Sequence, residues 1–348
     1  MTLPHLTFPA HVNLDVTYKC NASCSFCYII DQDAPLVQHT DISKLEKIIF
    51  RLAEAGALRI NFFGGEPLLL KELPYLIKYA KSLDLRTTLI SNGLPVSSRF
   101  CEEVAGHLDT MAISIHGLQP DHDRILGIPG AFEKILSRLE LLQRSNIDVG
   151  INYTVIEGAD KHFLDLARRL IGDYGVKFVS ANRFIGGRDK KDRDLTPSLD
   201  TLNNILDSFE IIESQFPDVT LAYAIYFPLC LVRKASHRRF LKACGMGSNY
   251  CSVDFNGNMK LCSYAKGTVG NLLAQDPVAL WNNSEILDRY RAGSWIPDAC
   301  QTCSLFSTCL SGCRVSDPSG DFGPDILTKI APITPIAAAQ SERIDAHV

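Results

Sequence analysis

The stretch that decides the fold is residues 12–27, which read Val-Asn-Leu-Asp-Val-Thr-Tyr-Lys-Cys-Asn-Ala-Ser-Cys-Ser-Phe-Cys. Its first part, Val12–Thr17, predicts a β-strand from its alternation of apolar and polar residues. Its second part places three thiols, Cys20, Cys24 and Cys27, within eight residues. Three thiolates on one loop can hold three irons of a 4Fe–4S cluster and leave the fourth iron open. A structural zinc site usually has a fourth Cys or His close by, and none follows before His39.

Outward from this stretch, strand-like and helix-like patterns alternate over about the first 180 residues. Such alternation predicts right-handed βαβ units and a parallel sheet. Periodicity alone leaves a partial open barrel and a doubly wound sheet as alternatives. The predicted strands are Val12–Thr17, Leu58–Phe63, Arg86–Ile90, Met111–Ile115, Val149–Val155 and Lys177–Ala181. Helical spacing of apolar residues marks helices around 45–52, 132–139 and 163–170, with Thr40 or Asp41 as the first N-cap.

Two further polar motifs follow predicted strands. Gly64-Gly65-Glu66-Pro67 comes after the second strand, and Ser91-Asn92-Gly93 comes after the third. In both candidate architectures the carboxyl ends of the strands carry the reactive groups. The cysteine loop and these two motifs are therefore expected at one site.

Composition excludes several classes of function. The chain has 348 residues, 46% of them hydrophobic and 21% charged, so it can bury a core. Its net charge of −4 lacks the basic excess of a nucleic-acid binder. No apolar run approaches the ~20 residues of a membrane span, and the start lacks a signal-peptide pattern, so we expect no membrane association and a cytoplasmic location. In a reducing compartment, the twelve cysteines indicate metal ligation more than disulfides.

After Asn182 the pattern changes. Residues 186–192 predict a polar loop and Leu199–Ile212 a helix, and from about Val219 the alternation is lost. Cys251–Cys262 predicts a hairpin whose turn, Asn256-Gly257, favours two positive φ angles. A helix over Val278–Tyr290 follows, and the tail from about Pro324 has little core-forming pattern.

The CxxxCxxC loop after one strand and Gly-Gly-Glu-Pro after the next resemble the radical SAM superfamily over residues 10–185. The resemblance implies a partial (β/α)6 barrel and a 4Fe–4S cluster on Cys20, Cys24 and Cys27, with its open iron chelated by S-adenosylmethionine. The Gly64 and Gly65 carbonyls and the Glu66 carboxylate would then accept hydrogen bonds from the ammonium group of that cofactor. Ordinary turn chemistry or core packing is the alternative for the remaining cofactor candidates. They are Phe26, Tyr28, Ser91, Asn92, Ser114 and Asn152.

Seven later cysteines, with the hairpin between two of them, are similar to the SPASM extension of radical SAM enzymes, although zinc ribbons share part of the pattern. The similarity implies auxiliary 4Fe–4S clusters, one on Cys244, Cys251, Cys262 and Cys313, and a second on Cys300, Cys303 and Cys309. The family's last cysteine is missing here. The second cluster would have an open iron, a ligand from Asp317 or Asp321, or Cys230, or it would be absent. We interpret Cys230 and Cys101 as core residues.

The predicted domains are a radical SAM core over 1–215, a SPASM domain over 216–325 and a tail over 326–348. SPASM enzymes mostly crosslink or oxidise ribosomally made peptides, so a precursor peptide is the expected substrate. The resemblance also implies a flavodoxin- or ferredoxin-type electron donor. Since only about eleven residues precede the first strand, we expect a leader peptide to be held by a leader-binding partner protein or by the barrel itself. The alternatives are a dehydrogenase or decarboxylase of a small molecule, and a non-catalytic zinc or iron–sulfur module. No catalytic proton acceptor is assigned; His116 is a candidate substrate contact or a structural residue.

Overall fold

The computed structural model describes residues 3–29, 40–185, 195–241, 243–316, 322–329, 331 and 333–336. The predicted polar loop 186–192, the candidate ligands Asp317 and Asp321, and part of the tail lie outside these residues. The chain forms two compact units. Unit 1 comprises Met1–Ile115, Gln119–Ile151 and Gly245–Gly293, and unit 2 comprises His116–Leu118, Asn152–Cys244 and Ser294–Val348.

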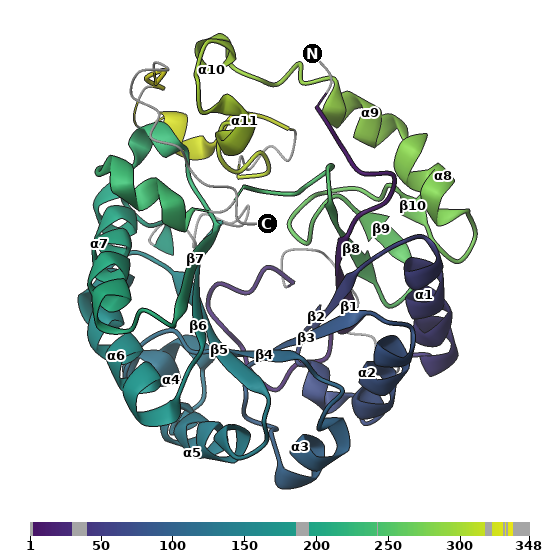
Figure 1. Ribbon diagram of the computed structural model, residues 1–348, viewed down its shortest axis with the longest axis vertical. Coiled ribbons are helices and arrows are strands. Elements are labelled where there is room, and N and C mark those ends of the chain that lie inside the picture. The colour runs from purple at the N-terminus through teal and green to yellow at the C-terminus, as the bar shows by residue number, and fades with distance from the viewer. Residues whose placement is uncertain are drawn as a thin grey trace. The chain divides into compact units, whose positions relative to one another are not determined.

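Unit 1 holds a mostly parallel sheet in the order β10-β9-β8-β1-β2-β3-β4, from which the chain passes into β5. Helices α1, α2 and α3 run side by side along one face of its strands (Figure 1). The strands are β1 (His11–Thr17), β2 (Arg59–Gly64), β3 (Arg86–Ser91), β4 (Thr110–Ser114), β8 (Tyr250–Asp254), β9 (Asn258–Lys260) and β10 (Gly270–Asn271). The helices are α1 (Ile42–Glu54), η2 (Pro67–Leu69), α2 (Leu73–Ser82), α3 (Ser98–Val104), α4 (Asp121–Leu126), α5 (Ala131–Gln143), α8 (Pro277–Asn282) and α9 (Glu285–Arg291).

Alternation along β1 divides its side chains between two environments. Val12, Leu14 and Val16 are wholly buried in the apolar core. The other face is polar: Asn61 Nδ2 donates to Asn13 Oδ1 at 2.8 Å across the β1–β2 pair. The predicted cap of α1 is confirmed, because Asp41 Oδ1 accepts the backbone N–H of Ser43 at 3.0 Å.

The predicted hairpin is present, but its turn differs. β8 and β9 pair antiparallel, and β8 also pairs in parallel with β1, so the hairpin extends the sheet. Gly257 has φ +84°, whereas Asn256 is not left-handed, and Gly257 N donates to Asp254 O. The Asp254 carboxylate accepts the N–H groups of Asn256 and Asn258 at 2.9 and 3.0 Å. This side chain therefore stabilises a wider turn than the two-residue one expected from Asn-Gly.

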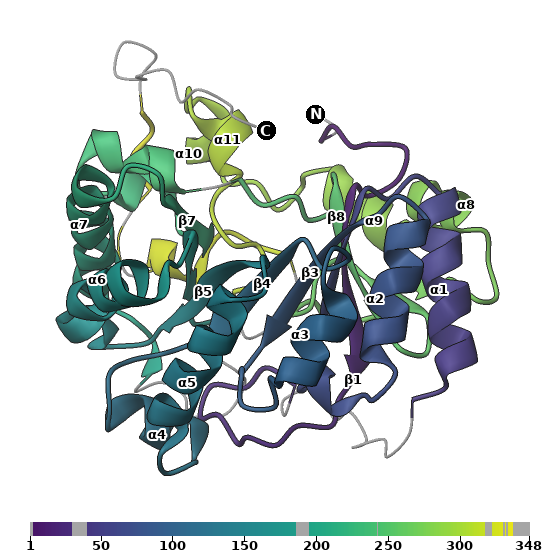
Figure 2. The same ribbon diagram turned by 60° about the horizontal axis from the view of Figure 1, so that its bottom comes forward.

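The strands of unit 2 are the second half of β5 (Asp148–Val155), β6 and β7, in that order. The predicted loss of alternation at Val219 is wrong, because Thr220–Ile225 forms β7, parallel to β6. Helices α6 and α7 lie beside each other and near β7 (Figure 2). The elements of unit 2 after β5 are η3 (Ala159–His162), α6 (Phe163–Tyr174), β6 (Phe178–Arg183), α7 (Leu199–Gln215), β7 (Thr220–Ile225), η5 (Leu229–Leu231), η6 (Ala235–Phe240), α10 (Asp298–Gln301), α11 (Phe306–Cys309) and η7 (Ile326–Lys329).

Two further expectations change. The single helix expected over 278–290 is broken at Asn283 and Ser284 into α8 and α9. All twelve cysteines lie in described residues and each is a free thiol, which contradicts the disulfide alternative. Within the described residues, no helix combines the length and apolarity needed to cross a bilayer.

Candidate metal and cofactor site

The loop that follows β1 carries Cys20, Cys24 and Cys27, with Cys20 exposed and the other two partly buried. Backbone hydrogen bonds fix its path against α4. Ser23 N donates to Leu126 O and Ser25 N donates to Ile125 O, both at 3.1 Å. The three thiols are therefore held on a loop that is anchored at its middle.

The chemistry of this donor set fits an iron–sulfur cluster. Burial raises the pKa of Cys24 to about 12, and the neighbouring Cys27 and Cys20 raise it further. Burial also raises the pKa of Cys20, although the Ala22 N–H donates to its Sγ at 3.4 Å and lowers it. Metal ions relieve such crowding of thiolates, because they bind the deprotonated form.

The number of thiols on this loop suits a cluster. A structural zinc ion usually takes four protein ligands. Three thiolates on one loop can hold three irons of a 4Fe–4S cluster and leave the fourth iron open.

Gly64 and Gly65 let the loop after β2 pack against the loop after β1. Gly64 has φ +129°, and a Cβ there would lie 2.2 Å from Thr17 O. A Cβ on Gly65 would lie 2.3 Å from Lys19 O. Gly65 N donates to Thr17 O at 2.7 Å, so the backbones touch directly. Both positions therefore require glycine, because any side chain would clash with the backbone of Thr17 or Lys19. Lys19 immediately precedes Cys20.

The carboxylate of Glu66 is fully buried and bonded within the protein. Its Oε1 accepts Ser91 Oγ at 2.7 Å and Leu68 N at 3.0 Å, and its Oε2 accepts Asn92 N at 2.7 Å. Burial raises the pKa of Glu66 to about 7, although these three hydrogen-bond donors lower it. The side chain therefore joins the ends of β2 and β3 instead of facing solvent, which points to a positioning role.

Asn92 connects this junction to the cysteine loop. Its Nδ2 donates to Asn21 Oδ1 at 2.7 Å, while its own Oδ1 accepts Leu94 N at 3.0 Å. Asn21 lies next to Cys20 in the sequence. Sequence analysis missed Asn21, because a polar residue on an exposed loop gives no signal of a long-range partner.

Tyr28 belongs to an aromatic and acidic group at the end of β1. Its ring stacks on Phe63 and contacts Tyr264, with centroids 5.9 and 5.0 Å apart. Its hydroxyl donates to Asp15 Oδ1 at 3.5 Å. Burial raises the pKa of Asp15 to about 7, and the nearby Asp254 adds to this increase, which Lys260 opposes. Asp15 was not among the sequence candidates. Phe26 is half-buried on the same loop.

The other polar candidates lie in different units. Ser114 ends β4 in unit 1 and is half-buried. In unit 2, Asn152 Oδ1 accepts Asn182 Nδ2 at 2.6 Å. His116 is buried in unit 2, where its Nδ1 accepts the Thr154 N–H at 3.0 Å. This bond to the backbone agrees with the structural alternative for His116.

A cavity in unit 2 gathers four cysteines. Cys230, Cys300, Cys303 and Cys309 all line it. The core role expected for Cys230 is thus incomplete, since its thiol shares a cavity with the other three. The remaining wall is mostly apolar and includes Leu229, Leu305, Phe306, Ile333 and Ile336.

The other set of auxiliary cysteines is divided between the units. Cys251 and Cys262 belong to unit 1, and Cys244 and Cys313 belong to unit 2. Burial raises the pKa of Cys313 to about 11, and Cys244 is near enough to contribute to that increase. Cys313 N also donates to Asp325 Oδ2 at 2.8 Å. The same carboxylate forms a buried double hydrogen bond with Arg183, at 2.9 and 2.7 Å.

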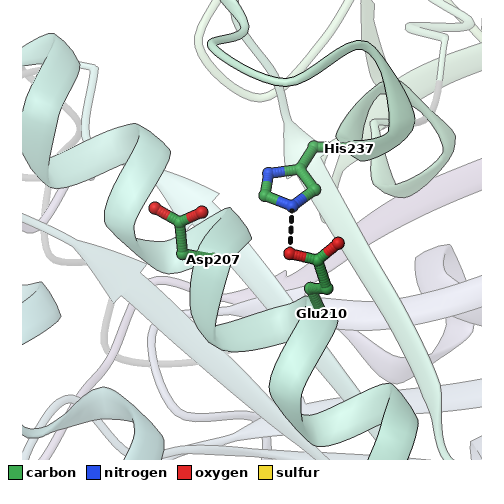
Figure 3. A group of neighbouring side chains, drawn as sticks. All are labelled: Asp207, Glu210 and His237. Carbon is green, nitrogen blue, oxygen red and sulfur yellow. Dashed lines mark hydrogen bonds and ion pairs between the residues drawn. The ribbon is translucent and has the colours of Figure 1, made fainter.

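Asp207, Glu210 and His237 form a separate group on α7 and η6 (Figure 3). His237 Nε2 lies 3.1 Å from Glu210 Oε2. Lys234 Nζ already binds Asp207 Oδ1 at 2.7 Å and Glu210 Oε2 at 2.9 Å. Its hydrogen bond lowers the pKa of Glu210 to about 2, with His237 contributing. A lysine ammonium takes the place a cation would need, so the group is an ion-pair cluster.

Comparison with known proteins identifies the family. Residues 14–170 match the family model described as the Radical SAM superfamily. This part of the chain therefore contains a radical SAM domain. Members use a 4Fe–4S cluster and S-adenosylmethionine, and the matched region contains the cysteine loop, the Gly-Gly-Glu-Pro turn and Ser91-Asn92.

The relatives of this chain include peptide-modifying and small-molecule enzymes. It is 26% identical to the PqqA peptide cyclase of Xanthomonas axonopodis pv. citri, covering 88% of this chain and 83% of that protein. It is 25% identical to the AdoMet-dependent heme synthase of Methanosarcina barkeri, covering 88% and 91%. The solved structure of Streptococcus suis SuiB bound to precursor peptide SuiA has a TM-score of 0.74 at 15% identity, covering 93% of this chain and 76% of that one. The predicted α/β radical SAM fold with a cysteine-rich extension is confirmed.

Proposed function

We propose that this chain cleaves S-adenosylmethionine reductively at a 4Fe–4S cluster on Cys20, Cys24 and Cys27 and uses that cleavage to abstract a hydrogen atom from a precursor peptide. The observation that carries the proposal is the anchored three-thiol loop, which lies against the glycine turn and has no fourth cysteine. When bound, the cluster and S-adenosylmethionine supply the one-electron chemistry of hydrogen abstraction.

The residues around this loop have distinct tasks. Thr17, Gly64 and Gly65 hold the two strand-end loops in contact. Glu66 and Asn92 fix the loop after β3 and, through Asn21, the backbone beside Cys20. Tyr28 and Phe26 are proposed to border the adenosyl group, and the Gly64 and Gly65 carbonyls to accept from its ammonium. Ser91 and Glu66 act through these neighbours, as positioning residues.

A ribosomally made peptide is the substrate we favour. Both a curated relative, named a peptide cyclase, and a structural neighbour, solved with a precursor peptide, act on or bind peptides. The cysteine cavity of unit 2 supports this choice, because crosslinking or oxidation of a peptide removes two electrons and needs an acceptor. A flavodoxin- or ferredoxin-type donor, a leader-binding partner protein and a cytoplasmic location complete the proposal.

A small-molecule substrate is the second candidate, because one relative is named a heme synthase. Mass spectrometry distinguishes the two. The anaerobic enzyme is incubated with S-adenosylmethionine, reductant and candidate peptides encoded beside its gene. Loss of two hydrogen atoms from a peptide supports the first candidate; turnover of a tetrapyrrole with unchanged peptides supports the second.

The cofactor part of the proposal is tested by Cys24→Ala beside the matched control Cys101→Ala. Cys101 is a buried thiol on α3. We expect Cys24→Ala to abolish 5′-deoxyadenosine formation and Cys101→Ala to retain it. Formation of that product by purified Cys24→Ala would show that the loop is not the cofactor site.

A further inference from the structure

The segment after β7 brings a fourth thiol to the three cysteines near the C-terminus. Tyr226 Oη donates to Cys309 O at 2.5 Å, and Leu229 N donates to Cys309 Sγ at 3.3 Å. A Cβ on Gly312 would lie 2.8 Å from Pro228 Cδ. These contacts hold residues 226–230 directly against the turn that contains Cys309, so Cys230 enters the same cavity.

The sulfurs around this cavity receive hydrogen bonds suited to thiolates. Leu229 N donates to Cys309, and Ile336 N donates to Cys303 Sγ at 3.5 Å. The backbone of Thr334 hydrogen-bonds the Cys230 thiol and lowers its pKa against the effect of burial. Donors of this kind stabilise the negative charge of cluster ligands and tune their potential.

Ser311 supplies a second, independent sign of a ligand. Its side chain is 2% exposed, it lines the cavity, and its hydroxyl is close enough to Cys300 to lower the pKa of that thiol. Its Oγ has no nitrogen or oxygen partner among the described residues. Leu310 and Ser311 both adopt positive φ, at 47° and 60°. Non-glycine residues take this conformation at a cost, and here it turns the backbone between Cys309 and Cys313.

We propose that Cys230, Cys300, Cys303 and Cys309 together ligate one auxiliary 4Fe–4S cluster, so that Cys230 replaces the cysteine missing after Cys313. With one thiolate per iron, the cluster has no iron open to substrate. This assignment rests on the proposed radical SAM function for the presence of iron–sulfur clusters, but not on the identity of the substrate.

The lining of this cavity suits a cluster. The four cysteines come from residue 230 and from 300–309 and line the same cavity. Apolar side chains complete the wall, and such walls exclude water from a buried cluster.

The test counts iron and sulfide in a background that lacks the first site, the variant Cys20→Ala/Cys24→Ala/Cys27→Ala. Cys230→Ala is added to this background, with Cys101→Ala as the matched control and Cys309→Ala as the positive one. We expect Cys230→Ala to lose the cluster or convert it to a three-iron form, seen as a new signal in the electron paramagnetic resonance spectrum of the oxidised protein, and Cys101→Ala to change neither iron nor spectrum.

Unchanged iron, sulfide and spectrum in Cys230→Ala, with loss in Cys309→Ala, would overturn the assignment, as would zinc in place of iron. A measurement on the unsubstituted holoenzyme covers the case in which Cys230→Ala fails to fold. Alkylation mapped by mass spectrometry should leave Cys230 protected until iron is removed, and equal labelling before and after would overturn the proposal. Failure of the proposed function is separate, because it appears as absent 5′-deoxyadenosine in the unsubstituted enzyme.

Discussion

The two cysteine sites differ in the number of their thiols and in the polarity of the residues around them. The loop after β1 supplies three thiols from one short segment, with Cys20 exposed, and a polar network holds its backbone. The cavity of unit 2 supplies four thiols from segments about seventy residues apart, with apolar walls and N–H donors to the sulfurs. In the clusters we propose, the first would leave one iron open to a small molecule, and the second would leave none. Whether a cluster iron is open to a small molecule thus depends on the number of cysteines and on the polarity of their surroundings.

The largest expected effect separates the two sites by activity. Cys309→Ala should retain formation of 5′-deoxyadenosine, because the first site is intact, and lose substrate modification entirely. Both products are measured in one anaerobic reaction by liquid chromatography and mass spectrometry. Full modification by this variant would mean that the unit 2 cavity has no part in the reaction, and the contrast between the sites would fail.

Breaking the ion pair between Arg183 and Asp325, next to Cys313, tests what this pair contributes to stability. Arg183 and Asp325 are 2% and 0% exposed, so Arg183→Met leaves a buried, unpaired carboxylate. Such losses cost about 3–5 kcal/mol of unfolding free energy. Arg99→Met, at a pair whose arginine is 86% exposed, should lower stability far less, because solvent screens an exposed ion pair. Thermal unfolding of the two variants compares them; equal midpoints would contradict the buried pair's importance.

The stability of the folded chain should depend on pH because of Asp15, which lies on β1 before the cysteine loop. In the folded chain burial raises the pKa of Asp15 to about 7, whereas the ordinary pKa of an aspartate is about 3.8. The unfolded chain therefore loses this proton first, and stability falls as the pH rises from about 4 to about 7. Asp15→Asn removes the effect, so this variant should gain stability relative to the unsubstituted protein over that range, by at most about 4 kcal/mol. Thermal midpoints at pH 5 and 8 measure the difference; a gap independent of pH would refute it.

Glu66→Gln gives the smallest expected effect. The amide nitrogen of glutamine would face a donor now bonded to the carboxylate, which leaves that donor unsatisfied. The expected cost is about 1–3 kcal/mol, with slower 5′-deoxyadenosine formation as the cysteine loop loosens. Glu72→Gln, at an exposed position, is the control. If both variants unfold at the same temperature, Glu66 does not hold the β2 and β3 loops together.

Local pattern predicted the first six strands closely, because alternating burial along a strand is written into consecutive residues. The predicted Val12–Thr17 lies within His11–Thr17, and Val149–Val155 lies within Asp148–Val155. β7 was missed although Leu221 and Tyr223 alternate with less buried neighbours, because a cysteine-rich segment without regular periodicity follows it. The break between α8 and α9 depends on Asn283 and Ser284, whose effect is weaker than that of glycine or proline.

For the site as well, local sequence features were predictable and long-range contacts were not. The cysteine loop and the glycine turn were predictable because their partners are local or follow the strand ends. The contacts of Asn21 with Asn92 and of Leu229, next to Cys230, with Cys309 join distant residues. Cys230 lies in an apolar run that looks like ordinary core. Its neighbours are fixed by tertiary packing, which periodicity does not report.

The parallel pairing of β8 with β1 affects how the chain can be shortened. Five consecutive residues of β1, from His11 to Asp15, have partners on β8. Removing the residues beyond 244 would remove β8 and leave β1 as an exposed edge strand. Its unpaired backbone N–H and C=O groups would favour aggregation. The cysteine-rich extension is thus part of the scaffold for the first loop, and a trimmed catalytic half is a poor goal for expression.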